Sequence, residues 1–113
     1  MRRLFAVSAF VALGFFQSGI APALGDDLPA FTLTIKDHLF SPADLTIPAN
    51  TKVVIVVKNL DPTVEEFEST DFHREKIVAG GGEIEVYVGP LPAGTYEFFA
   101  DFHPTTRGHL IVK

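Results

Sequence analysis

Cysteine is absent from this chain of 113 residues, and so is tryptophan. Without a thiol, the protein can form neither a disulfide nor a thiolate–metal bond. The only methionine is Met1, so no thioether ligand is available further along the chain. Basic residues are also scarce, nine against 14 acidic ones, giving a net charge of −5. This balance argues against nucleic acid and anionic membranes as partners, and it suits cations.

The N-terminus has the pattern of an export signal. Two arginines precede an apolar run over residues 4–16, and small residues leading to Gly25 fit a cleavage site. We therefore predict a signal peptide over residues 1–25, a single domain over residues 26–113, and a periplasmic location. The apolar run is short for a membrane span, which needs about 20 residues. A retained N-terminal anchor is the alternative.

The rest of the chain is a series of short β-type segments with turn residues about every ten positions. Strands are predicted over residues 30–36, 45–48, 52–59, 65–69, 77–78, 83–88, 96–101 and 108–112. The polar stretch over residues 70–76 is expected to be irregular, with room for one helical turn. This pattern predicts an all-β sandwich of seven to eight strands, paired antiparallel, with Phe31, Phe67 and Phe98 pointing into the core.

The last segment carries a family resemblance. Residues 96–112 read Y-E-F-F-A-D-F-H-P-T-T-R-G-H-L-I-V, which resembles the C-terminal ligand loop of the cupredoxins. That loop supplies Cys, His and a weak axial Met to a blue copper ion, and an earlier loop supplies a second His. Here the His is His103, but Ala100 stands at the Cys position and no Met follows. The resemblance implies a Greek-key β-sandwich of cupredoxin type, with type-1 blue copper not expected.

The ligand region of this fold is rich in carboxylates. In a cupredoxin the earlier loop and the C-terminal loop meet at one end of the sandwich. The corresponding segments here are E-E-F-E-S at residues 65–69 and A-D-F-H at residues 100–103. Carboxylate and imidazole groups favour Fe(II), Fe(III) or Mn(II), or Cu(II) and Zn(II) by affinity order. The expected cofactor is therefore a metal ion, iron or copper.

A closer resemblance covers residues 31–113. The motifs E-F-E-S, R-E-K-I-V and G-P-L-P-A-G-T-Y-E-F-F-x-D-F-H are similar to those of cupredoxin-like domains of the EfeO and FtrB type, from bacterial periplasmic iron-uptake systems. Such domains work beside a high-affinity iron permease and are thought to bind or oxidise ferrous iron, or to hold copper for that purpose. The resemblance implies a metal on Glu66, Glu68, Asp101 and His103.

Other residues remain open as ligands. Strand alternation places Glu66 and Glu68 on the face opposite to Glu65, and alignment to the generic cupredoxin pattern would select Glu65 instead. His73 and His109 are further alternates. His38 is expected to be an exposed turn residue far from the site.

Three functions fit these observations. The first is a monomeric metal-binding protein that serves an iron permease or other periplasmic iron-uptake components. The second is a copper-binding electron-transfer or ferroxidase component, which is the one enzymatic activity considered. The third is a metal-free module that docks onto a permease or a periplasmic subunit.

Overall fold

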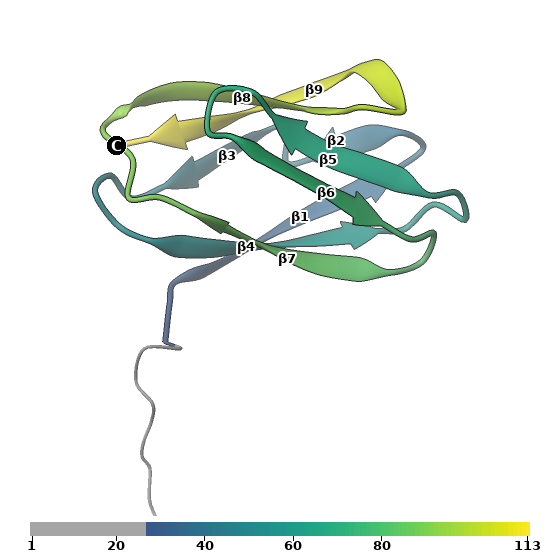
Figure 1. Cartoon of the computed structure of the whole chain (residues 1–113), viewed down its shortest axis with the longest axis horizontal. Coiled ribbons are helices and arrows are strands. Elements are labelled where there is room, and N and C mark those ends of the chain that lie inside the picture. Colours follow the sequence, from purple (N-terminus) through teal and green to yellow (C-terminus); the bar gives the residue numbers. More distant parts are fainter. Residues whose placement is uncertain (1–26) are drawn as a thin grey trace, which may run out of the picture.

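The computed structural model describes residues 27–113, which form two β-sheets packed face to face (Figure 1). The predicted signal peptide lies outside the described residues. The strands are β1 (Ala30–Lys36), β2 (Leu39–Ser41), β3 (Asp44–Ile47), β4 (Val53–Asn59), β5 (Glu65–Ser69), β6 (Arg74–Val78), β7 (Glu83–Val88), β8 (Gly94–Ala100) and β9 (His103–Val112). No helix of sufficient length and apolar character to cross a membrane occurs in this part of the chain.

The two sheets have the strand orders β2-β1-β4-β7 and β3-β9-β8-β5-β6. Two neighbouring pairs, β1 with β4 and β3 with β9, are parallel. The other pairs are antiparallel. The predicted all-β sandwich of cupredoxin type is confirmed, although its sheets are mixed and not purely antiparallel.

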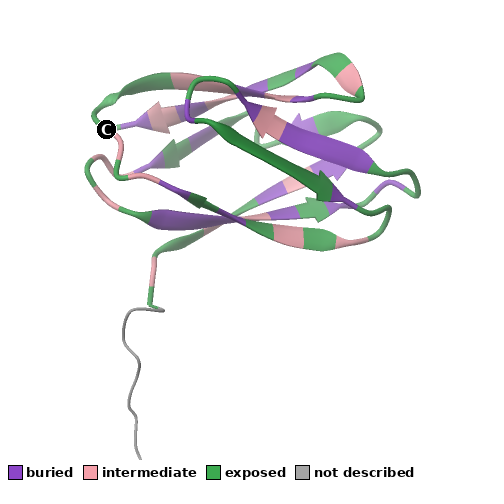
Figure 2. Cartoon of the chain, viewed as in Figure 1, coloured by how far each residue is buried: buried purple, intermediate pink, exposed green. Residues whose placement is uncertain are grey.

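Aromatic and aliphatic side chains form the core between the sheets. Figure 2 shows where the buried residues lie along the strands. Phe67 and Phe98 are fully buried and their ring centroids lie 5.3 Å apart. Phe40 packs edge-on against Phe98, at 4.9 Å. Two of the three predicted core phenylalanines are thus confirmed, whereas Phe31 is only partly buried at the margin of the core. This burial is the main stabilising contribution in a chain without disulfides.

Two predicted segments differ from the structure. The polar stretch after β5 does not contain a helical turn, because the chain turns over residues 70–73 and β6 already begins at Arg74. The first four residues of β6 are exposed, so this edge strand shows no hydrophobic alternation. His103 was expected in a loop, but it is the first residue of β9.

The turn between β1 and β2 is stabilised by the carboxylate of Asp61, which lies in the loop after β4. Asp37 and His38 have positive φ angles of 52° and 59°, a conformation that costs energy for residues other than glycine. Asp61 accepts hydrogen bonds from both backbone N–H groups, at 2.7 and 2.9 Å. Because β1 runs parallel to β4 and pairs Ile35 with Asn59, this turn lies at the end of the sandwich where β4 leads to Asp61.

Candidate metal centre

Two groups of possible metal ligands lie on and around β5. One group consists of Glu66, Glu68 and Asp101, and the other of His38, Glu65 and His103. Within each group, one donor atom per residue lies within 4.8 Å of the others. Successive side chains of a strand point to opposite faces, so neighbouring residues of β5 contribute to different groups.

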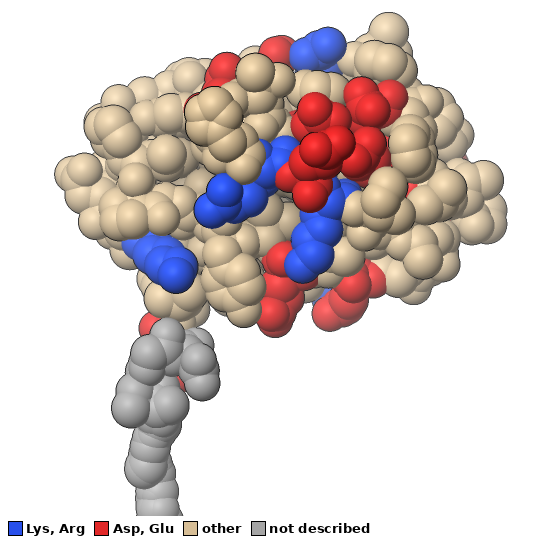
Figure 3. Space-filling model, viewed as in Figure 1, with Lys and Arg blue, Asp and Glu red and all other residues tan. Residues whose placement is uncertain are grey.

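The first group is part of an acidic patch on the outer face of the sheet. Glu66 and Glu68 occupy alternate positions of β5, and the backbone N–H of Asp101 donates to the carbonyl oxygen of Glu66 at 2.9 Å. Glu75 of β6 pairs with Glu68 across the two strands. We call these four residues the acidic cluster; Figure 3 shows acidic side chains gathered over β5 and β6, with basic side chains beside them.

Burial and like charge act together on Glu66. Glu66 is only 8% exposed. Burial raises the pKa of its carboxyl to about 7, and hydrogen bonding and repulsion from Glu75 and Asp101 add to this effect. The pKa of Glu68 is raised as well, mainly by burial and then by the charges of Asp101 and Glu75. No Lys, Arg or His among the described residues forms an ion pair with any member of the cluster. The acidic cluster therefore carries charge that a bound cation would neutralise.

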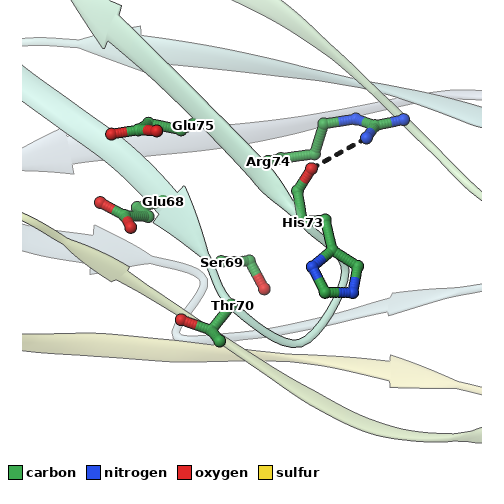
Figure 4. Close-up of a pocket in the computed structure, with 6 residues that line it drawn as sticks. All are labelled: Glu68, Ser69, Thr70, His73, Arg74 and Glu75. Carbon is green, nitrogen blue, oxygen red and sulfur yellow. Dashed lines mark hydrogen bonds between the residues drawn. The ribbon is translucent and has the colours of Figure 1, made fainter.

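A solvent-open pocket of about 340 Å³ adjoins the acidic cluster. In Figure 4 the carboxylates of Glu68 and Glu75 lie side by side and point the same way. The ring of His73 lies at the other end of this pocket, in the turn before β6, and Arg74 directs its guanidinium away from the carboxylates. Arg74 instead donates to the carbonyl oxygens of Tyr87 and His73, at 2.7 and 2.9 Å.

The second group is built around a buried carboxylate. Glu65 is 2% exposed, and its Oε1 atom accepts hydrogen bonds from the backbone N–H groups of Glu66 and Phe102, both at 3.0 Å. Its Oε2 atom lies 2.6 Å from Nδ1 of His103. The imidazole of His38 stacks on that of His103, with ring centroids 3.8 Å apart. Both oxygens of Glu65 thus have hydrogen-bond partners.

The structure divides the predicted ligand set between these groups. Glu66, Glu68 and Asp101 come together as predicted, but His103 does not join them; it pairs with the alternate candidate Glu65. The remaining alternates are in neither group. His73 lies in the turn described above, and Nδ1 of His109 lies 3.4 Å from Oδ1 of Asp44.

His38 is the residue that sequence analysis placed wrongly. It is exposed, as expected, but it lies against His103 at the ligand end of the sandwich. The prediction of antiparallel pairing did not bring the turn with His38 to this end of the sandwich. Parallel pairing of β1 with β4 brings the ends of both strands to the same edge, and with it the turn that carries His38.

Comparison with known proteins agrees with this fold. A family model described as a cupredoxin-like domain matches residues 6–112. An uncharacterized protein of Rickettsia prowazekii (strain Madrid E) is 46% identical over 99 residues, which cover 87% of this chain and 79% of that protein.

Several solved structures are similar in fold. The metal-binding domain of the Cu(I)-exporting P-type ATPase CopA of Streptococcus pneumoniae, solved with Cu(I), has a TM-score of 0.70 and 14% identity, covering 80% of this chain and 91% of that one. Amicyanin from Paracoccus versutus has a TM-score of 0.62 and 20% identity, covering 77% and 86%. A purple cupredoxin from Nitrosopumilus maritimus has a TM-score of 0.58 and 22% identity, covering 74% and 99%.

The residues present do not fit a type-1 copper ion. Such a site needs a cysteine thiolate, and the position that would carry it is Ala100, which is fully buried in the core. The chain has no cysteine, and its only methionine is Met1. What remains at this end of the sandwich are carboxylate and imidazole donors.

Proposed function

The chain belongs to the family of cupredoxin-like domains, and from this premise we propose that it binds a metal ion through carboxylates, in the service of iron uptake. The binding residues of the proposal are Glu66, Glu68 and Asp101. The family has the β-sandwich fold described above. Because the chain has no cysteine, its metal ligands must be oxygen or imidazole donors.

The observation that carries the proposal is the environment of Glu66. Glu66 is a buried residue, and one of its carboxylate oxygens lies within 4.8 Å of a carboxylate oxygen of Glu68 and of Asp101. The only hydrogen-bonding partners that act on it among the described residues are the acids Glu75 and Asp101. Buried charges are ordinarily paired or bound to a metal. A cation held by three carboxylates would remove the repulsion that the metal-free cluster contains.

The donor set selects the class of metal. Carboxylate oxygens suit hard and borderline ions such as Mn(II), Fe(II) and Fe(III), whereas Cu(I) prefers sulfur ligands. Within this class we propose ferrous or ferric iron for the acidic cluster, because the resemblance to EfeO and FtrB-type domains implies an iron-uptake role. The Cu(I) with which the structurally similar ATPase domain was solved favours sulfur donors, and this chain has no cysteine to supply them.

The proposed setting is the periplasm. The N-terminal sequence pattern of an export signal, the net negative charge and the resemblance to EfeO and FtrB-type domains support a small protein that receives ferrous iron and passes it to a permease. Oxidation of the bound iron by dioxygen is part of the same proposal, because carboxylates stabilise Fe(III) more strongly than Fe(II). Four Fe(II) ions give one electron each to one O2, which takes up four protons and leaves as two water molecules. The proposed partner is an iron permease or another component of its uptake system. We propose that the protein binds this partner as a monomer.

Calorimetric titration with Fe(II) under nitrogen tests the proposal. The native protein is expected to bind with micromolar or tighter affinity, and the double variant Glu66→Gln/Glu68→Gln to bind at least about tenfold more weakly. The matched control is Glu83→Gln/Glu85→Gln, which removes the same charge from a glutamate pair at alternate positions of β7. Equal weakening in both variants, or no binding to the native protein, would overturn the proposal. The absence of binding would favour the metal-free docking module.

A second arm separates binding from turnover. The rate at which Fe(II) disappears in air is compared between buffer, native protein and the Glu66→Gln/Glu68→Gln variant. A ferroxidase component is expected to accelerate this loss catalytically, and the variant to lose the acceleration. Binding without acceleration would assign the protein a carrier role alone.

A further inference from the structure

One side of the sandwich has two open edges. β6 is an edge of the five-stranded sheet and β7 an edge of the four-stranded sheet, and Figure 1 shows both strands on the same side of the molecule. The other two edge strands, β2 and β3, have only three and four residues. β7 has six residues and is the longest of the four edge strands that the structure describes. An edge strand is a template on which another chain can pair.

The backbone of β7 directs polar groups away from its own sheet. In an antiparallel pair, every second residue points both its N–H and its C=O away from the neighbouring strand. Within the antiparallel pair that β7 forms with β4, the carbonyl oxygens of Glu85 and Tyr87 accept hydrogen bonds from side chains of β6. Glu85 and Tyr87 therefore occupy outward positions, which are the positions to which an added strand would bind.

Two cationic side chains of β6 cover these positions. Nε of Arg74 donates to the carbonyl oxygen of Tyr87 at 2.7 Å, and Nζ of Lys76 donates to that of Glu85 at 2.9 Å. Both side chains line a groove of about 270 Å³ between β6 and β7. They share a strand face with the fully buried Val78, so they point from β6 towards the opposite sheet. Inward-pointing charges at a sheet edge are one way in which proteins block edge-to-edge pairing.

We propose that Arg74 and Lys76, which we call the capping pair, keep the protein monomeric. By binding the outward carbonyl oxygens of β7, they prevent a second copy of this chain from adding its own β7 to the sheet. A second copy is the partner that fits, because its β7 presents the same outward groups and two identical antiparallel strands pair with twofold symmetry. The proposal does not rest on metal binding, since Glu75 of the acidic cluster lies on the other face of β6.

The charges on both strands suit this role. Arg74 and Lys76 are exposed residues, so their aliphatic stems can cross the groove while their charged groups stay in contact with water. An added strand must displace both charged groups before it can bind to β7. Pairing of two copies would also bring together their exposed Glu83 and Glu85 side chains, and like charges on paired strands repel. The capping pair and these glutamates thus act in the same direction.

Analytical ultracentrifugation of the protein in EDTA, which keeps metal ions from linking two copies, tests the proposal. The variant Arg74→Met/Lys76→Met keeps long side chains and removes both donors. The matched control is Lys36→Met/Lys58→Met, which removes two exposed lysines from β1 and β4 and adds the same two methionines. We expect the native protein and the control to stay monomeric. We expect Arg74→Met/Lys76→Met to dimerise, with a dissociation constant at least about tenfold below that of any self-association of the other two.

A third variant places the association at β7. Arg74→Met/Lys76→Met/Glu85→Pro lacks the outward N–H of residue 85, and proline is tolerated on an edge strand where that N–H makes no bond within the sheet. We expect this variant to be monomeric again. Three results would overturn the proposal: a monomeric Arg74→Met/Lys76→Met that is folded by circular dichroism, dimerisation of the control, or a dimer that persists with Glu85→Pro. Should the double variant lose its fold, the single variants Arg74→Met and Lys76→Met decide, and two folded monomers would overturn the proposal equally.

Discussion

Nδ1 of His103 lies 2.6 Å from Oε2 of Glu65, a carboxylate that is 2% exposed. This contact joins the start of β9 to the start of β5 at the ligand end of the sandwich. The other oxygen of Glu65 accepts the backbone N–H groups of Glu66 and Phe102. One buried side chain therefore organises the backbone from which both groups of ligands project.

Replacement of Glu65 should destabilise the fold according to how many of these bonds are lost. Glu65→Ala removes the acceptor of the buried N–H of Glu66 and of the partly buried N–H of Phe102, and we expect it to lower the free energy of unfolding by about 2–4 kcal/mol. Glu65→Gln keeps an oxygen for the N–H groups, so we expect a loss of about 1–2 kcal/mol. Urea unfolding measures both values. Equal losses in the two variants would show that these backbone bonds contribute little.

The stability of the metal-free protein should depend on the ionisation of Glu66. Because its pKa is raised from 4.5 to about 7, the folded state favours the protonated carboxyl. This contribution is fully present below pH 4.5 and is lost as the pH rises towards 7. We expect Glu66→Gln to raise the melting temperature at pH 8 by several degrees, corresponding to about 1 kcal/mol, and to have little effect at pH 4.5. A larger stabilisation at pH 4.5 than at pH 8 would contradict the role given to this carboxyl.

Asp61 should show the opposite dependence on pH. Its hydrogen bond from the backbone N–H of His38 is the main cause of its lowered pKa. A lowered pKa contributes stability above the ordinary value of 3.8, and this stability is lost as the pH falls through the folded-state pKa. Asp61→Asn should lower the melting temperature at pH 7, and the difference should shrink below pH 3.8. Asp44→Asn, on an exposed residue, is the control and should change little at either pH.

Gly108 marks a close approach between β9 and the core. A Cβ atom at this position would lie 2.6 Å from the ring of Phe98 and 2.7 Å from the carbonyl oxygen of Ala43. Gly108→Ala should therefore destabilise the protein by about 1–3 kcal/mol. At Gly94 the nearest atoms would be at 3.5 Å, so Gly94→Ala should have a smaller effect. Thermal unfolding of the two variants compares them, and equal effects would argue that Phe98 can move aside.

Much of the fold could be predicted from sequence, because alternation along β1 and β7 reports which residues face the core, and the continuous apolar run of β4 marks a central strand. The exposed edge strand β6 has no such alternation, and its start was missed for that reason. Strand alternation predicted that Glu66 and Glu68 share one face of β5, and the family resemblance added Asp101 to them. The position of His38 could not, because it depends on the parallel pairing of β1 with β4, which alternation within single strands does not report.

The central claim is that Glu66, Glu68 and Asp101 hold a metal ion. The most direct test is anomalous diffraction at the iron edge from crystals of the protein loaded with Fe(II) under nitrogen at pH 8, where Glu66 is ionised. We expect an anomalous peak with oxygen atoms of all three carboxylates within about 2.0–2.6 Å. The absence of a peak there, or a peak only between His38 and His103, would contradict it.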